Sequence, residues 1–421
     1  MSMTAVDNLA EVAAAAYRLT TDGAITQPAE WQVALYARLS QPEADAGDLL
    51  LAPDGAGKTE AVLIPSLGFR RGGAPHRLFL IGPDGSPLDE PLCRLTPYLR
   101  AWVGADETPR TLCLDYAEDD ADGNVCRRFF PDGTEDPHIE TNPLEADVDL
   151  ILTTFSRFQS LFFGAGGVHA LPSGLPTEDA EHHQRRDLFF FDEAHSYQPD
   201  AFARFHRLVE FLFAEDNDIF VASTTMPPAY QEELSFLDVI RVPERPDAPA
   251  RTLAHVPAAD PLAEIEARIR REYFQNARVF GVTESVADAE SLYARLASSY
   301  PHSVYLYHPS LPADARRRTY AQLRELEKEG EGYLLLTTGD ALESSDLDAT
   351  VLLSTLCPPE NLIRRAGRCN RRGEMPSGQL VLVGDRFAPA SRPLPKAADY
   401  LAALGEHSGR TFDAEFWKAF I

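Results

Sequence analysis

Short apolar runs recur along the whole chain, and they constrain its fold more than any other feature. Before residue 245 they are DLLLAP, HRLFLIGP, TLCLD, LILTT, LFFFDEAH and IFVASTT, and after residue 262 they are ARVFGV, SVYLYHP, YLLLTTG, TVLLST and GQLVLVG. Runs that are apolar on both faces are typical of buried parallel strands, which need crossover helices between them. The pattern therefore predicts an α/β fold with two parallel sheets built in series.

A proline-rich stretch, VPERPDAPARTLAHVPAADP, separates the two series of runs. Its five prolines argue against a helix or a central strand, because proline has no backbone N–H to donate. We place the domain boundary near residues 242–262. The predicted parts are a first domain at 1–245, a linker at 246–261, a second domain at 262–390 and a short tail at 391–421.

The segment 164–187, GAGGVHALPSGLPTEDAEHHQRRD, carries no apolar periodicity. Glycine, proline and charged residues dominate it, so we expect a surface loop. His182 and His183 are adjacent within it, but their polar neighbours favour a solvated loop over a metal site.

Charge and cysteine content narrow the class of protein. The chain has 65 acidic and 39 basic residues and a formal net charge of −26. Sequence-independent binding to phosphate backbones usually requires net positive charge, so any nucleic-acid contact should come from a local groove. The five cysteines form no CxxC pair, which favours reduced thiols. With no signal peptide and no long apolar run, we expect a soluble cytoplasmic protein without a membrane span.

One glycine-rich turn lies between a predicted strand and a predicted helix, in LLLAPDGAGKTEAVLIP. Gly55, Ala56 and Gly57 allow the backbone to approach a phosphate, and the amides at the helix start point at it. Lys58 can reach the β and γ phosphate oxygens, and Thr59 can bind Mg²⁺. The turn predicts an ATP site with Mg²⁺. The alternative is a glycine-rich strand-to-helix turn with an incidental lysine.

An acidic pair follows the apolar strand of LFFFDEAHSYQPD. Asp192 and Glu193 should lie at the carboxyl edge of the sheet, the edge that also presents the glycine-rich turn. Asp192 is suited to the magnesium shell, and Glu193 to orienting or deprotonating the attacking water. Either residue taken alone could be a helix cap.

Five motifs together resemble a known superfamily. APDGAGKTEA, DEAH, STTMP, TTGDALESSDLDA and LIRRAGRCNRRGE occur in the order of motifs I, II, III, V and VI of superfamily 2 helicases. The GKTEA and AGRCNRRGE wording looks most like the helicase part of CRISPR-associated helicase–nucleases. The resemblance implies two tandem RecA-like domains with ATP in the cleft between them. It also implies a motor that moves 3′ to 5′ on single-stranded DNA and unwinds duplex DNA.

The resemblance also implies roles for residues near the nucleotide. Gln32 is placed like the glutamine that recognises adenine, although a helix-surface glutamine is the alternative. His195 resembles the last residue of the DEAH box, which communicates with motif III. Ser223 and Thr225 resemble the hydroxyl residues that couple hydrolysis to domain movement.

Motifs V and VI contribute further residues by the same resemblance. Arg365, Arg368 and Arg371 would meet the phosphates from the second domain, and their spacing would align them along one helix. Arg368 and Arg371 would be the catalytic pair. Asp346 would contact the ribose of the nucleotide, although motif V is one residue shorter than usual between Glu343 and Asp346.

Nucleic-acid contacts are expected at four positions. Backbone amides after Pro83, together with Thr153 and Thr154, could bind phosphates. In YHPSLPADARRR the resemblance suggests that His308 and one or two of the arginines 316–318 face the nucleic-acid backbone, and a solvated basic face is the alternative for the arginines.

The resemblance suggests how the chain would work with others. Only about 30 residues precede Gln32, too few for the His-Asp nuclease domain that such helicases often carry. We expect a stand-alone motor for antiviral defence, with a CRISPR effector complex and a separate nuclease subunit as partners. The alternatives are a superfamily 2 helicase acting on RNA or repair intermediates, and a catalytically weak helicase-fold scaffold.

Overall fold

The computed structural model divides the chain into two compact units, unit 1 (Met1–Glu244) and unit 2 (Arg245–Ile421). The division falls inside the proline-rich stretch. The structure describes residues 3–21, 25–39, 47–53, 56–68, 77–83, 89–106, 109–114, 125–139, 148–163, 187–194, 197, 199–215, 217–224, 226–242, 251–272, 277–343, 345–371, 373, 375–387 and 397–411.

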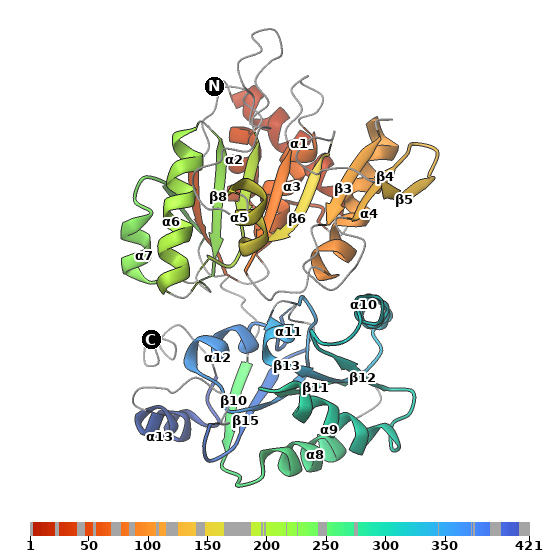
Figure 1. Cartoon of the computed structure of the whole chain (residues 1–421), viewed down its shortest axis with the longest axis vertical. Coiled ribbons are helices and arrows are strands. Elements are labelled where there is room, and N and C mark those ends of the chain that lie inside the picture. Colours follow the sequence, from red (N-terminus) through yellow and green to blue (C-terminus); the bar gives the residue numbers. More distant parts are fainter. Residues whose placement is uncertain are drawn as a thin grey trace. The chain divides into compact units, whose positions relative to one another are not determined.

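The described part of unit 1 contains one nine-stranded sheet (Figure 1). Its strands are β1 (Gly47–Leu51), β2 (Leu78–Gly82), β3 (Arg110–Leu114), β4 (Val125–Phe129), β5 (Glu135–Ile139), β6 (Leu150–Thr154), β7 (Leu188–Phe191), β8 (Asp218–Ser223) and β9 (Asp238–Arg241). The order is β5-β4-β3-β6-β2-β7-β8-β1-β9. All neighbours pair in parallel except β4, which is antiparallel to β3 and β5.

Helices cover both faces of this sheet (Figure 1). They are α1 (Met3–Thr20), α2 (Glu30–Leu39), α3 (Lys58–Gly68), α4 (Asp89–Asp106), α5 (Phe155–Phe163), α6 (Pro199–Ala214) and α7 (Pro228–Glu233). The first four share one apolar core and the last three share another. Alternation along each strand feeds both cores, since Leu80 belongs to the first and Phe79 to the second. The predicted α/β fold of unit 1 is confirmed.

Unit 2 has a six-stranded sheet in its described part, with every pair parallel. Its strands are β10 (Arg251–Val256), β11 (Arg278–Thr283), β12 (Val304–Tyr307), β13 (Tyr333–Thr338), β14 (Val351–Thr355) and β15 (Gly378–Val383), and its helices are α8 (Pro261–Glu272), α9 (Val286–Ala297), α10 (Ala313–Glu329), α11 (Gly339–Glu343), α12 (Pro359–Ala366) and α13 (Ala397–His407). The order is β10-β15-β14-β11-β13-β12. Helices α8 and α9 pack on one face around Ile265 and Leu292.

Two elements lie in the segments predicted as linker and tail. The predicted linker contains β10, because RTLAHV carries no proline and an edge strand needs only one hydrogen-bonded neighbour. The predicted tail contains α13, which packs near β10. Beyond α13 the chain returns to the outer side of β10. There the Leu253 N–H donates to the Arg410 carbonyl (3.0 Å), and the Gly409 N–H donates to the Leu253 carbonyl (2.6 Å).

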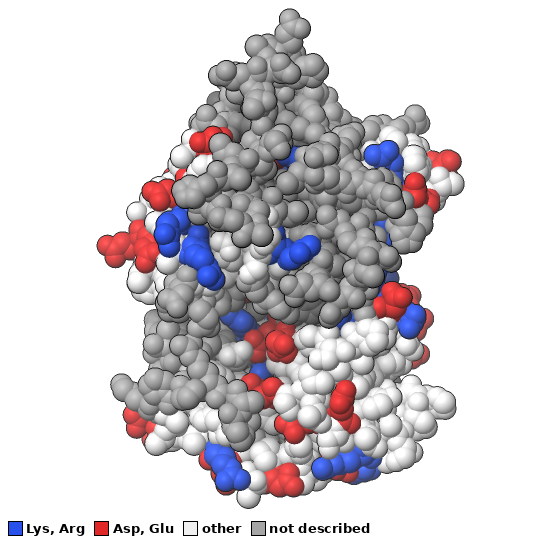
Figure 2. Space-filling model, in the orientation of Figure 1, with Lys and Arg blue, Asp and Glu red and all other residues white. Residues whose placement is uncertain are grey.

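The expectations about the 164–187 segment, the cysteines, membrane spans and charge can be compared with the structure only for the described residues. The loop at 164–186, with His182 and His183, lies outside the described residues. Cys357 and Cys369 are buried free thiols. None of the helices in the described segments is long and apolar enough to cross a membrane. Figure 2 shows basic side chains among the acidic ones on the described surface of one face, which weakens any single-sign field there.

Candidate functional site

The turn between β1 and α3 brings the glycine-rich residues to the carboxyl edge of the unit 1 sheet. Gly57 has a φ of +81°, and a Cβ built there would lie 2.7 Å from the Gln32 Nε2, so only glycine fits. Lys58 begins α3, and its Nζ donates to the Ala52 carbonyl at 3.1 Å. A strand followed by a tight turn and then by the N-terminus of a helix produces this local geometry. Gly55 lies outside the described residues.

Gln32 lies on α2 and is only 4% exposed, so the alternative of a helix-surface glutamine is wrong. Its amide nitrogen donates to the carbonyls of Ala56 (3.4 Å) and Gly57 (3.3 Å). Its amide oxygen accepts from the Ala29 N–H at 2.9 Å. Gln32 therefore braces the glycine-rich turn, which is a contact that the sequence did not suggest.

The acidic pair follows β7. The Asp192 N–H donates to the Ile81 carbonyl at 2.9 Å, and the Glu193 N–H donates to the Asp192 Oδ1 at 2.9 Å. Glu193 has a φ of +53°, a conformation that costs an L-residue about 1–2 kcal/mol. Burial, with the charge of Glu193, raises the pKa of the Asp192 carboxyl to about 6, while Lys58 acts to lower it. The charges of Lys58 and Glu193 thus both act on the Asp192 carboxyl.

Three strand ends meet at this edge, since β7, β8 and β1 are consecutive in the sheet. Asp192 follows β7, the glycine-rich turn follows β1, and Ser223 ends β8 between them. Ser223 is fully buried, and its carbonyl accepts from the Ala52 N–H at 3.1 Å. The other two residues expected to couple hydrolysis to movement, His195 and Thr225, lie outside the described residues.

The residues present suit a magnesium ion. Thr59 offers a hydroxyl and Asp192 a carboxylate, both oxygen ligands of the kind that Mg²⁺ takes. Within the described segments there is no group of three or more His, Cys, Asp or Glu residues that could hold a metal. Mg²⁺ is commonly held by one or two protein ligands together with phosphate oxygens and water.

Arg94 and Tyr98 of helix α4 contact Thr59 and Glu60, and no sequence motif includes them. Arg94 on α4 donates from Nη2 to the Thr59 Oγ1 at 3.1 Å, and its Nε lies 3.8 Å from the Glu60 Oε1. The Tyr98 hydroxyl donates to the same Glu60 oxygen at 3.2 Å. The only signal in the sequence is the four-residue spacing of Arg94 and Tyr98, which places both on one helix face.

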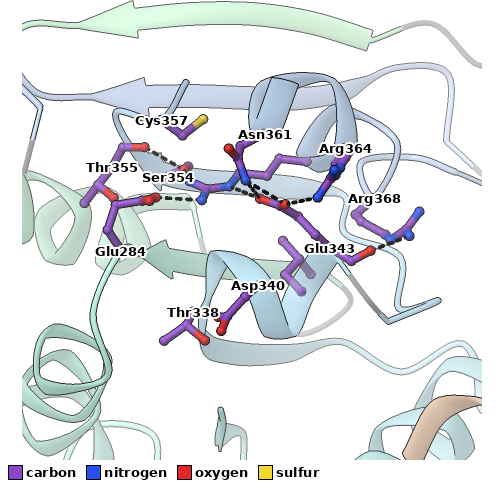
Figure 3. Close-up of polar contacts among 12 residues, drawn as sticks. Glu284, Thr338, Asp340, Glu343, Ser354, Thr355, Cys357, Asn361, Arg364 and Arg368 are labelled. Atoms are coloured by element: carbon purple, nitrogen blue, oxygen red, sulfur yellow. Dashed lines mark hydrogen bonds and ion pairs between the residues drawn. The ribbon is translucent and has the colours of Figure 1, made fainter. Parts of the chain in front are cut away.

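In unit 2, motif VI forms a buried polar network around Glu343 (Figure 3). Arg365 is 1% exposed, and its guanidinium donates to the Glu343 Oε1 (3.0 Å), the Ser354 Oγ (2.6 Å) and the Glu284 Oε1 (2.6 Å). A Cβ on Gly339 would lie 2.0 Å from the Arg365 Nη2. Three of its five N–H donors are thus used inside unit 2, and the contact of Arg365 with the nucleotide stays a prediction.

Asn361 and Arg364 complete the network. The Asn361 Nδ2 donates to both Glu343 carboxylate oxygens, at 3.0 and 2.8 Å, and the Arg364 Nη1 lies 3.5 Å from one of them (Figure 3). Burial raises the pKa of Glu343, while Arg365 and Arg364 act to lower it. The charge of Arg364 is therefore matched by a buried carboxylate.

The expected row of three arginines on one helix is wrong, because α12 ends at Ala366. Arg368 is buried in the turn that follows, and its Nη2 donates to the Glu343 carbonyl at 2.7 Å (Figure 3). Arg371 is partly exposed, and its backbone N–H donates to the Asp348 Oδ1 at 2.7 Å. Of the three predicted phosphate contacts, Arg371 is the most accessible.

Asp346, expected at the ribose, faces α10. It accepts a hydrogen bond from the Tyr320 hydroxyl, and its Oδ2 lies 3.5 Å from the Arg324 Nη2. The structure therefore shows an interaction within unit 2 and gives no support to the ribose contact.

The expected nucleic-acid residues differ in accessibility. His308 is 1% exposed, and burial lowers the pKa of its imidazole; its contact with the nucleic-acid backbone stays a prediction. Thr153 is fully buried and donates to the Thr154 carbonyl at 3.3 Å. Pro83 and Thr154 are partly exposed at the ends of β2 and β6, which are neighbours in the sheet. They remain predicted contacts.

Comparisons with known proteins concern the second unit and the fold. The family model of the CRISPR-associated nuclease/helicase Cas3, C-terminal, matches residues 275–374. No curated protein sequence matches the chain.

Solved helicase structures share the fold. A structure of S. cerevisiae Dbp5 bound to RNA and ADP BeF3 is 15% identical at a TM-score of 0.59, covering 91% of this chain and 88% of that one. T. fusca Cas3 is 18% identical at a TM-score of 0.60, covering 96% and 52%. The DUF1998 helicase MrfA bound to DNA and AMPPNP is 15% identical at a TM-score of 0.58, covering 94% and 52%. The chain thus has the tandem RecA-like fold of superfamily 2 helicases, and its second unit resembles the C-terminal part of Cas3.

Proposed function

We propose that the chain is an ATP-dependent motor that moves on single-stranded DNA and unwinds duplex DNA. One observation carries the proposal. The ends of three consecutive strands, β7, β8 and β1, bring Asp192, Ser223 and the turn with Lys58 to one edge of unit 1. Ligands of open α/β sheets bind at such an edge.

Each residue of this edge has a proposed role in hydrolysis. Lys58 leaves the Ala52 carbonyl and binds phosphate oxygens, while Thr59 and Asp192 hold Mg²⁺. The metal, when bound, neutralises charge on the β and γ phosphates. Glu193 orients the attacking water and accepts its proton, and its strained backbone fixes the carboxylate in place.

Unit 2 would supply the positive charge that the reaction needs at the γ phosphate. We assign that role first to Arg371, because its side chain is partly exposed. Arg368 would join it after releasing the Glu343 carbonyl. An arginine that meets charge developing in the transition state accelerates related reactions by about 10³–10⁵.

The finer parts of the proposal concern the substrate and the partners. The match of residues 275–374 to the Cas3 family supports a role in CRISPR interference with an effector complex. We propose 3′ to 5′ movement, with DNA cleavage performed by a separate nuclease subunit. The acidic composition suggests that loading on DNA depends on a partner.

The test is ATP turnover by the full chain with single-stranded DNA, with and without Mg²⁺. Lys58→Ala should weaken nucleotide binding, and Glu193→Gln should bind ATP yet lose at least about a hundredfold in turnover. Lys328→Ala removes a largely exposed lysine of unit 2 and is the matched control. Turnover by Glu193→Gln at the parent rate would contradict the assigned role of Glu193.

An RNA helicase is the second candidate. The likeness to Dbp5, whose structure holds RNA, has almost the same TM-score as the likeness to Cas3. Stimulation of turnover by single-stranded RNA, and not by DNA of the same sequence, would favour this candidate. Duplexes with a 3′ or a 5′ single-stranded tail would then give the direction of movement.

A further inference from the structure

We infer that Arg94 sets the magnesium requirement of the nucleotide site by competing with the metal ion for the Thr59 hydroxyl. The inference rests on the proposed function, because it concerns the same ATP site. It adds a residue outside the five helicase motifs, on helix α4.

The geometry places the guanidinium of Arg94 on the oxygen assigned to the metal. Its Nη2 lies 3.1 Å from the Thr59 Oγ1, and its positive charge also acts on the Asp192 carboxyl. Both proposed magnesium ligands therefore already interact with a cation from α4. A divalent ion that binds the same two groups meets the repulsion of this charge at short range.

Arg94 also lies beside an acidic residue of unit 1, Glu60. The Arg94 side chain is 23% exposed, and the Glu60 side chain is 10% exposed. Glu60 also accepts a hydrogen bond from Tyr98, one turn after Arg94 on the same helix. The carboxylate thus has two partners on α4, and its negative charge partly compensates the guanidinium beside Thr59.

The consequence is a nucleotide site that holds little Mg²⁺ by itself. A phosphate group adds negative charge and further oxygen ligands, which favour the metal over the guanidinium. Arg94 can then turn toward Glu60. Metal and nucleotide would therefore enter together, because neither proposed protein ligand is released to the metal alone.

The experiment measures binding of a fluorescent ADP derivative to the full chain, first with excess EDTA and then during titration with Mg²⁺. Arg94→Gln should lower the half-saturating Mg²⁺ concentration by about three- to tenfold, because a competing positive charge is lost. Its affinity for the nucleotide in EDTA should stay within about twofold of the parent. Arg100→Gln, on the exposed side of α4, is the matched control and should behave as the parent does.

Glu60→Gln provides a second variant with the opposite sign. Without the carboxylate the positive charge beside Thr59 is less compensated, so the half-saturating Mg²⁺ concentration should rise by about two- to fivefold. If Arg94→Gln does not fold, Glu60→Gln tests whether the positive charge beside Thr59 raises the magnesium requirement. An unchanged magnesium requirement in the folded variants would overturn the inference.

Two further outcomes separate the inference from the proposed function. Weaker binding of the nucleotide in EDTA by Arg94→Gln, with an unchanged magnesium requirement, would make Arg94 a direct phosphate ligand and overturn the competition. A parent protein that binds no nucleotide even with Mg²⁺ would instead refute the proposed ATP site.

Discussion

Gly339 allows the buried guanidinium of Arg365 to sit against the backbone of α11, so Gly339→Ala should destabilise unit 2 strongly. The added Cβ would lie 2.0 Å from the Arg365 Nη2 and 2.9 Å from its Cζ. Three hydrogen bonds, from 2.6 to 3.0 Å, hold this group in place. Relieving the contact breaks or lengthens at least two of them. At about 1.5–3 kcal/mol for each bond to a charged group, the expected loss is about 3–5 kcal/mol.

Hydrogen exchange followed by mass spectrometry is the suitable assay, because it reports the opening free energy of β13 and α11 separately from unit 1. Gly405→Ala is the control, since nothing lies within 4 Å of its added Cβ and helix α13 should gain up to about 1 kcal/mol. A loss below about 1 kcal/mol in Gly339→Ala would show that Arg365 is not held as described.

Three more predictions follow from groups in unusual environments. Burial raises the pKa of Asp48 from 3.8 to about 6 although Arg38 pairs with it, so its contribution to stability is present below about pH 4 and is lost as pH rises through about 6. Asp48→Asn should remove this slope, worth up to about 3 kcal/mol, in urea unfolding measured from pH 4 to pH 8; an unchanged slope would refute it. Glu193→Gly should stabilise unit 1 by about 0.5–1 kcal/mol in thermal unfolding while abolishing turnover, because glycine accepts the positive φ; a destabilised variant would argue against backbone strain. Asp346→Asn should leave nucleotide affinity within about twofold of the parent and weaken the packing of α10; a large loss of affinity with unchanged stability would restore the ribose contact.

Most strands found from the sequence are buried on both faces and therefore have continuous apolar runs. Strand β12 is the exception, because its run VYLY is apolar although the strand lies at the sheet edge and is only half-buried in its middle. The strands that were missed lie at or near sheet edges. Strand β4 carries Arg127 and Arg128, and β5 carries Pro137, a residue tolerated only where a backbone donor is not needed. Strand β9 is mostly exposed. The conformation of such strands depends on pairing with other strands that are distant in sequence. Their own sequence therefore carries no clear strand pattern.

The same distinction explains which site residues could be predicted. Gly57, Lys58 and Thr59 are consecutive in the sequence, so one short segment contains the residue types that phosphate and magnesium binding require. The environment of Arg365 depends on Glu284 and Glu343, which come from separate elements of unit 2. A motif position identifies the residue type but not its partners. The sequence therefore does not show that Arg365 is buried while Arg371 is partly exposed.

The return of the chain along β10 protects the sheet of unit 2 from self-association. Edge strands with unpaired backbone groups are templates for pairing with other chains. Residues 409–411 occupy the outer side of β10, through the two backbone bonds of Leu253 and the antiparallel bridge between Thr252 and Thr411. Shortening the chain before Gly409 would open this edge to edge-to-edge aggregation or strand exchange between copies. Residues 409–411 thus cap this edge of the sheet.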